Sequence, residues 1–255
     1  MNQSVIIVGM GEMGGVFARG FLKAGYSVIP VNRNQDMLSV LQENPQVQLI
    51  LIAVAEKDLP AVLAHIPASC SDRIGLLQNE LLPNDWLHAG LKNPTVISVW
   101  FEKKPGMDAR VLLPSPVHGP AAALLQKALG AIQIPAQIID NEDDMLFELV
   151  RKNLYILTTN LCGLQTGGNV SQLWKDNAVL LNHVFDDILK IQEYLTGKTF
   201  QRDHLLSAVL TAFEADPDHQ CMGRSAVQRL QRALHIAQQA GLDTPQLENL
   251  AKNTD

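Results

Sequence analysis

The sequence predicts an α/β fold in which a doubly wound parallel sheet is followed by an all-helical half. Three observations support this prediction. Short apolar segments alternate with helical patterns over the first half of the chain. A glycine-rich turn lies directly between the first apolar segment and the first helical one. From about residue 143 strand patterns stop and apolar residues recur at helical spacing, so we expect two domains, 1–142 and 143–255.

The elements of the first domain follow from the period of the apolar residues. The segment 47–54 is apolar at every position except Gln48, as expected for a strand of a parallel sheet covered on both faces. The segment 114–120 contains three prolines and is interpreted as a loop, with His118 as a structural histidine. Strands are predicted at 4–8, 26–31, 47–54, 73–77, 95–100, 110–113 and 136–139, and helices at 12–24, 35–43, 58–65 and 120–129.

The second domain is predicted to be helical throughout. Apolar residues from Leu146 to Leu164 fall on one helical stripe, behind a helix start at Asp143-Asp144. Asp186-Asp187 is interpreted as part of a solvated helix face. Further helices are predicted at 176–195, 203–215 and 224–240, with a short last helix opened by Thr244-Pro245.

Composition excludes several classes of function. The hydrophobic content of 47% can form one or two cores, and the net charge of −6 gives no basic footprint for nucleic acid. No apolar run reaches the roughly 20 residues that span a bilayer, and no secretory signal pattern precedes the first strand. The three cysteines are widely spaced and form no zinc-ligand pattern. We therefore expect a cytoplasmic protein with reduced thiols, no metal, no membrane and no nucleic-acid partner.

The glycine-rich turn has the sequence Gly9-Met-Gly-Glu-Met-Gly14. Gly9 permits a tight turn, Gly11 lets the backbone approach a diphosphate, and Gly14 lets the helix pack closely on the strand. The first amides of the new helix then point at an anion. The motif predicts a dinucleotide site, and the candidate cofactor residues here are Gly9, Met10, Gly11, Glu12, Met13, Gly14 and, at the end of the third strand, Val54.

The end of the second strand indicates which dinucleotide binds. An NAD site usually places Asp or Glu there to hold the ribose 2′-hydroxyl. This chain has Asn32-Arg33-Asn34 instead, and a guanidinium attracts a 2′-phosphate that a carboxylate would repel. The predicted cofactor is therefore NADP, with Asn32 and Arg33 at its ribose.

Three further segments carry a family resemblance. They are Leu76-Leu-Gln-Asn79, Leu149-Val-Arg-Lys-Asn-Leu-Tyr-Ile-Leu-Thr-Thr-Asn160 and Ala240-Gly-Leu-Asp-Thr-Pro245. With them the chain resembles the ketopantoate reductase family (2-dehydropantoate 2-reductases) along most of its length. The resemblance implies a Rossmann domain, a helical domain for substrate binding and dimerisation, and an active site between them.

The resemblance also implies residue roles. Lys152 corresponds to the general acid that protonates the oxygen as hydride reaches a keto carbon. Asn79, also a cofactor contact, corresponds to an asparagine near the nicotinamide, and Asn160 to an amide that contacts substrate. We expect a small-molecule substrate and a homodimer as the assembly.

The chain departs from the family at several positions. A lysine that contacts cofactor or substrate is replaced by Ala55, and the glycine after Asn79 is replaced by Glu80. The substrate-binding serine becomes Cys221, and the glutamate after it has no counterpart. Ketopantoate itself is therefore not the expected substrate. Arg224 and Ser225 are the candidates to replace the lost contacts, since arginine can clamp a carboxylate bidentately.

Three functions remain open from the sequence. The first is an NADP-dependent oxidoreductase that transfers hydride to a small 2-oxo acid or related carbonyl compound. The second is a relative without catalysis that binds NADP as a sensor or interaction protein, favoured by the lost lysine and glutamate. The third is a β-hydroxyacid dehydrogenase, which suits the glycine motif but usually has asparagine where this chain has Ile156.

Overall fold

The computed structural model describes residues 3–223 and 225–253. The chain forms two compact units, Met1–Leu149 and Val150–Asp255. The boundary expected after residue 142 coincides with the start of helix α6 (Glu142–Thr166), whereas the division between the units falls inside that helix.

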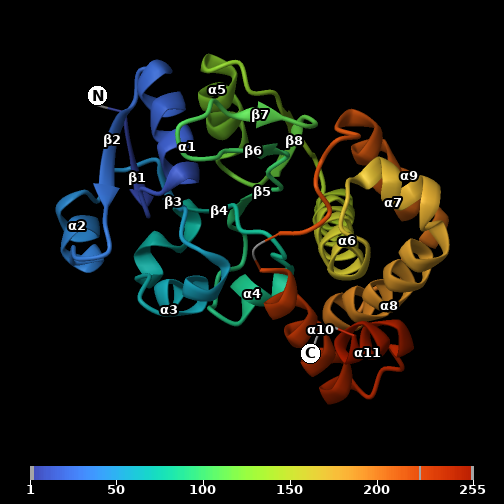
Figure 1. Cartoon of the computed structure of the whole chain (residues 1–255). Helices are drawn as coiled ribbons and strands as arrows, with labels where there is room; N and C mark the ends of the chain where they lie inside the picture. Colours follow the sequence, from blue (N-terminus) through green and yellow to red (C-terminus); the bar gives the residue numbers. More distant parts are fainter. Residues whose placement is uncertain (1–2, 224, 254–255) are drawn as a thin grey trace. The chain divides into compact units, whose positions relative to one another are not determined.

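The first unit is built on a mostly parallel sheet, with seven strands among the described residues (Figure 1). Its order is β2-β1-β3-β4-β5-β8-β9. Strands β1 to β5 run parallel, β8 pairs antiparallel with β5, and β9 runs parallel to β8. The α/β prediction is confirmed, except that the sheet is not parallel throughout. The strands are β1 (Ser4–Val8), β2 (Ser27–Val31), β3 (Leu49–Ile52), β4 (Ile74–Leu76), β5 (Thr95–Ile97), β8 (Ser115–His118) and β9 (Ala136–Ile138).

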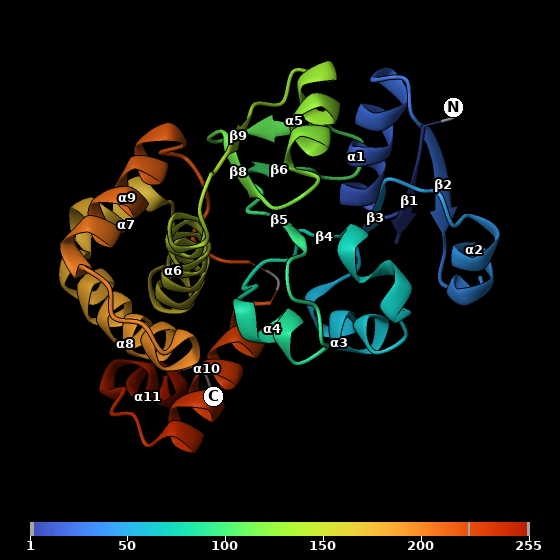
Figure 2. The same cartoon turned by 180° about the vertical axis from the view of Figure 1, so that it is seen from behind.

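Helices cover both faces of this sheet. Helices α1 and α5 lie side by side on one face, and α3 and α4 lie on the other (Figures 1 and 2). The first face buries Phe17 and Phe21 against Val5 and Ile7. The short contact between α1 and α5 depends on Gly20, where a Cβ atom would lie 2.6 Å from the Ala128 carbonyl oxygen. The helices are α1 (Glu12–Lys23), α2 (Met37–Glu43), α3 (Leu59–Leu63), α4 (Pro83–Leu87) and α5 (Ala122–Ala131), with 3-10 turns η1 (Glu56–Asp58) and η2 (Ala68–Arg73).

Two sequence-based predictions in this unit are wrong. The strand predicted at 110–113 is only β7 (Arg110–Val111), which pairs with β6 (Phe101–Glu102) in a separate hairpin. The predicted loop at 114–120 instead contains β8. Proline lacks a donor but keeps its acceptor, and the Pro116 carbonyl accepts a hydrogen bond from the Ser98 amide at 2.9 Å. The prediction of a loop from the proline content alone was therefore wrong for this strand of the sheet.

The second unit is helical, as predicted. Residues 153–163 of α6 are all buried, a wider apolar surface than the single stripe expected. Helices α7, α8 and α9 curve around α6 (Figure 2). No helix in the described part of the chain is both long and apolar enough to cross a membrane. The helices after α6 are α7 (Val170–Asp176), which was not predicted, α8 (Ala178–Thr196), α9 (Arg202–Ala215), α10 (Ala226–Ala240) and α11 (Pro245–Lys252).

The interpretation of Asp186-Asp187 as a solvated face is wrong for Asp187. Its side chain is 4% exposed, and Oδ2 accepts hydrogen bonds from the Gln246 and Leu247 amides at 2.8 and 3.2 Å. These amides begin α11 and have no partner within their own helix. Lys190 pairs with the other carboxylate oxygen at 3.1 Å. Asp187 therefore fixes the start of the last helix on α8.

Candidate functional site

The glycine-rich turn joins the end of β1 to the start of α1. Gly9 has φ +96°, and a Cβ atom there would lie 2.8 Å from the Ala53 carbonyl oxygen. At Gly14 a Cβ atom would lie 2.0 Å from the Gly9 carbonyl oxygen. Gly11 is different, because nothing lies within 4 Å of its Cβ position. Two glycines are thus required by close packing within the turn, and the third faces open space at the helix start.

This turn forms one wall of a cleft of about 880 Å³ in the first unit. The cleft lies where β1, β2 and β3 end, the edge at which open α/β sheets bind their ligands. It brings together six of the predicted cofactor residues, whereas Glu12, Met13, Gly14 and Asn79 are not among its lining residues. The six are Gly9, Met10, Gly11, Asn32, Arg33 and Val54.

The segment after β2 places one basic and one acidic side chain at this cleft. Arg33 is exposed and lines it, and so does Asp36, an acid that the sequence-based site did not include. Asp36 caps α2, since its oxygens accept from the Leu38 amide at 3.1 Å and the Ser39 hydroxyl at 2.6 Å. These hydrogen bonds, the Ser39 bond first, hold the pKa of Asp36 below its usual value. The carboxylate is therefore ionised and engaged at the helix start.

The turn after β4 contains the predicted nicotinamide contact. Asn79 is exposed, and Glu80 after it has φ +59°, the left-handed conformation that glycine adopts without strain. The neighbouring Gln78 is buried and donates to the Ile52 and Val54 carbonyls at 2.7 and 3.2 Å. Gln78 thus ties the ends of β3 and β4 together, a role that its position in the quoted segment did not reveal.

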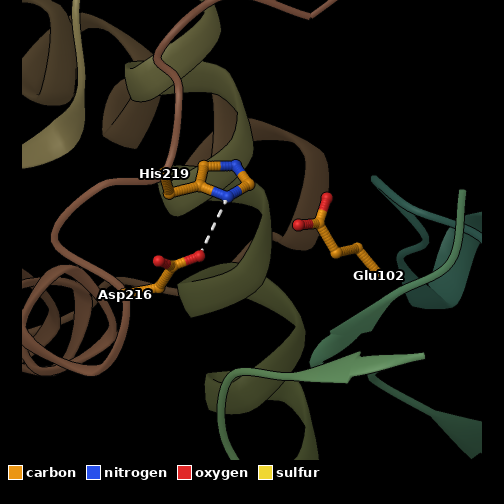
Figure 3. A group of neighbouring side chains, drawn as sticks. All are labelled: Glu102, Asp216 and His219. Atoms are coloured by element: carbon orange, nitrogen blue, oxygen red, sulfur yellow. Dashed lines mark ion pairs between the residues drawn. The ribbon is translucent and has the colours of Figure 1, made fainter. Parts of the chain in front are cut away.

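The predicted proton donor is on α6 in the second unit. Lys152 is half-buried, with Nζ 5.4 Å from the centre of the Tyr155 ring. The Tyr155 ring lies 5.8 Å from the ring of His219, and His219 Nδ1 lies 3.5 Å from Oδ2 of the buried Asp216 (Figure 3). His219 was not among the site residues predicted from the sequence. The ammonium of Lys152 and the imidazole of His219 therefore both lie next to the phenol ring of Tyr155 in this unit.

Asn160 lies farther along α6 and is buried. Its Oδ1 accepts from the guanidinium of Arg229 on α10 at 2.9 Å. Because a guanidinium can only donate, this bond fixes which end of the amide is oxygen. Gly223 is close as well, since a Cβ atom there would lie 2.6 Å from the same Oδ1. The predicted substrate residue Ser225 is exposed at the N-cap of α10, and Arg224 lies outside the described residues.

The remaining candidates have structural roles. His118 Nδ1 lies 2.8 Å from the Ile139 carbonyl oxygen, at the end of β8, which runs against β5 and so ends at the sheet edge opposite the glycine turn. Cys70, Cys162 and Cys221 are free and buried. Burial raises the pKa of Cys162, and raises that of Cys221 to about 11, so both thiols stay protonated at neutral pH.

The sequence matches no protein-family model and no curated protein. Solved structures do match. The 2-dehydropantoate 2-reductase from Methylococcus capsulatus gives a TM-score of 0.71 at 12% identity, covering 97% of this chain and 94% of that one. The dimeric ketopantoate reductase from Staphylococcus aureus gives a TM-score of 0.65 at 19% identity, covering 98% of this chain and 97% of that one. D-mandelate dehydrogenase with NADH and anilino(oxo)acetate gives a TM-score of 0.65 at 14% identity, covering 98% of this chain and 96% of that one. This chain therefore shares the fold of the ketopantoate reductases over nearly its whole length.

Proposed function

We propose that this protein is a divergent ketopantoate reductase-like oxidoreductase that uses NADP to reduce a small 2-oxo acid or related carbonyl compound. The observation that carries the proposal is the cleft at the ends of β1, β2 and β3, with the glycine turn as one wall. The reductases and the mandelate dehydrogenase that share this fold support it.

The residues of the cleft fit a dinucleotide. Gly9 and Gly14 close the turn so tightly that no side chain can enter it, while the space at Gly11 is open for a diphosphate beside the first amides of α1. Bound NADPH would supply the hydride. The chain's own task is to hold the cofactor and substrate in position and to deliver a proton.

Arg33 supports NADP over NAD. Its guanidinium lines the cleft at the end of β2, where a 2′-phosphate would be placed. Asp36 also lines the cleft, but its carboxylate is engaged by the start of α2. We therefore assign the 2′-phosphate to Arg33, and Asn32 to the same ribose.

The assignment to NADP is tested by fluorescence titration with NADPH and NADH. Arg33→Ala should weaken NADPH binding about tenfold or more, because a charge-assisted hydrogen bond contributes roughly 1.5–3 kcal/mol. NADH affinity should stay unchanged. Arg110→Ala, at an exposed arginine that does not line the cleft, is the matched control. Equal losses for the two cofactors in Arg33→Ala would contradict the assignment.

Lys152 is the proposed proton donor. An ammonium stabilises the negative charge that develops on a carbonyl oxygen and then supplies the proton. Asn160, whose amide orientation is fixed by Arg229, is proposed to donate a hydrogen bond to the substrate. Asn79 is proposed to lie near the nicotinamide.

Turnover is tested by NADPH oxidation with a panel of 2-oxo acids. Lys152→Met should lower kcat roughly 10²–10⁴-fold, the range for a general acid, while leaving NADPH affinity intact. Lys175→Met, at an exposed lysine on α7, is the control. Undiminished turnover in Lys152→Met would exclude this mechanism.

A second candidate function is an NADP-binding protein without catalysis. Ala55, which lines the cleft where the family has a lysine, favours it. Tight NADPH binding with no oxidation of any carbonyl compound in the panel would select this candidate. We also propose a homodimer, which light scattering after size exclusion would test against a monomer of 28.0 kDa.

A further inference from the structure

The glycine turn contains an acidic side chain where the proposed cofactor would place its diphosphate. Glu12 is the first residue of α1, and its carboxylate is 43% exposed. The free amides and the dipole of a helix start attract any anion, so Glu12 and a diphosphate would compete for the same end of α1. Two like charges there would repel each other unless a cation accompanies them.

A cation is present beside Glu12. Lys103 follows β6 in the hairpin, and its Nζ lies 2.9 Å from Glu12 Oε2. Nζ also donates to the Lys104 carbonyl oxygen at 2.8 Å, which fixes the ammonium in place. The Lys103 side chain is only 20% exposed. The two partners and the low exposure define the position of the Lys103 ammonium. Fixing a long charged side chain in this way costs conformational entropy.

Lys103 lines a cleft that residues of the glycine turn also line. A second cleft of the first unit, of about 550 Å³, is lined by Lys103 and Glu12. Met10 and Gly11 line both this cleft and the larger one. The glycine turn is therefore flanked on one side by the cleft that holds Arg33 and on the other by the Lys103–Glu12 pair.

The same hairpin contains a pair that differs in these respects. Lys104 pairs with Glu102 at 3.4 Å, its side chain is 65% exposed, and it lines neither cleft. Lys104 thus shows that a lysine of this hairpin can pair with an acid while it stays exposed and away from the clefts. The low exposure of Lys103 and its place beside the turn are therefore not needed for pairing alone.

We propose that Lys103 is a cofactor-binding residue that neutralises Glu12 and contacts the diphosphate of the dinucleotide. This inference rests on the proposed function. It assigns to Lys103 a phosphate group that NADPH and NADH share, whereas Arg33 is assigned the 2′-phosphate that NADPH alone carries.

The test compares four variants with the wild-type protein by titration with NADPH and with NADH. Lys103→Met should weaken both cofactors by the same factor, about tenfold, because a hydrogen bond from a charged donor is lost. Glu12→Gln should have the opposite sign and strengthen both about threefold, since the repulsion is removed. Lys103→Arg should retain most of the affinity, and Lys104→Met should change neither. Thermal unfolding checks that each variant is folded.

Unchanged affinities in Lys103→Met, a loss confined to NADPH, or weaker binding in Glu12→Gln would each overturn this inference. Failure of the proposed function is a separate result. There the wild-type protein itself would bind neither cofactor, whereas here it binds both and only the variants disagree.

Discussion

The sharpest prediction concerns Gly14, because its neighbour Gly15 provides a matched control on the same helix. A methyl group at Gly14 would lie 2.0 Å from the Gly9 carbonyl oxygen, whereas contacts under 3.0 Å essentially do not occur. The turn and the helix would have to separate by at least about 1 Å, the difference between these distances. At Gly15 nothing lies within 4 Å.

The magnitude follows from two opposing effects. Alanine is favoured over glycine in a helix by roughly 1 kcal/mol at either position. Gly15→Ala should therefore raise the free energy of unfolding by about 0.5–1 kcal/mol. At Gly14 the clash is with backbone, which cannot relieve it by rotating a side chain, and overpacking costs roughly 1–3 kcal/mol or more. We expect Gly14→Ala to be less stable than Gly15→Ala by about 1–3 kcal/mol or more, because the helix preference for alanine is the same in both variants and cancels in the difference.

Urea unfolding measures these free energies, and NADPH titration measures the site. Because the 1 Å displacement moves the amides of the turn, Gly14→Ala should also lose at least about tenfold in NADPH affinity. Gly15→Ala should keep its NADPH affinity and show the small gain in stability given above. If Gly14→Ala matched Gly15→Ala in stability and in NADPH affinity, the close approach of turn and helix would be refuted.

Three further predictions concern stability and are measured by the same urea unfolding. Glu80→Gly should stabilise by about 1 kcal/mol, since glycine removes the strain of the left-handed conformation, and a loss of stability would contradict the positive φ. Asp187→Ala should destabilise by about 2 kcal/mol through loss of the α11 cap, whereas Asp186→Ala, at a half-exposed ion pair with Arg202, should cost under about 1 kcal/mol. Equal effects would argue against the cap. Gln78→Leu should cost roughly 1–3 kcal/mol, because the carbonyls at the end of β3 lose a buried donor, and a neutral effect would mean that water replaces it.

Local pattern predicted much of the first unit correctly. The buried strands β1 and β3 follow from unbroken apolar runs, and α1 follows from its apolar spacing and the glycine turn before it. The errors arose where local pattern and pairing disagree. The prolines around β8 suggested a loop, because sequence does not show that a neighbouring strand needs only the Pro116 carbonyl.

The candidate site divides in the same way. Six residues of the larger cleft were predictable because they follow closely on the ends of β1, β2 and β3, and parallel strands bring these ends together. The Lys103–Glu12 pair was not, since 91 positions separate its members. The same holds for the Arg229 bond to Asn160 and for the cap that Asp187 provides to α11.

By itself, the sequence determined most of the strands and helices, the glycine turn and the charge at the end of the second strand. These depend on the period of apolar residues and on backbone preferences, which act over a few neighbouring positions. Only the tertiary structure decided which polar groups are buried and which partners satisfy them. The reason is physical: a buried charge or amide must find a donor or acceptor wherever the fold brings one within about 3 Å, however far away it lies in the chain.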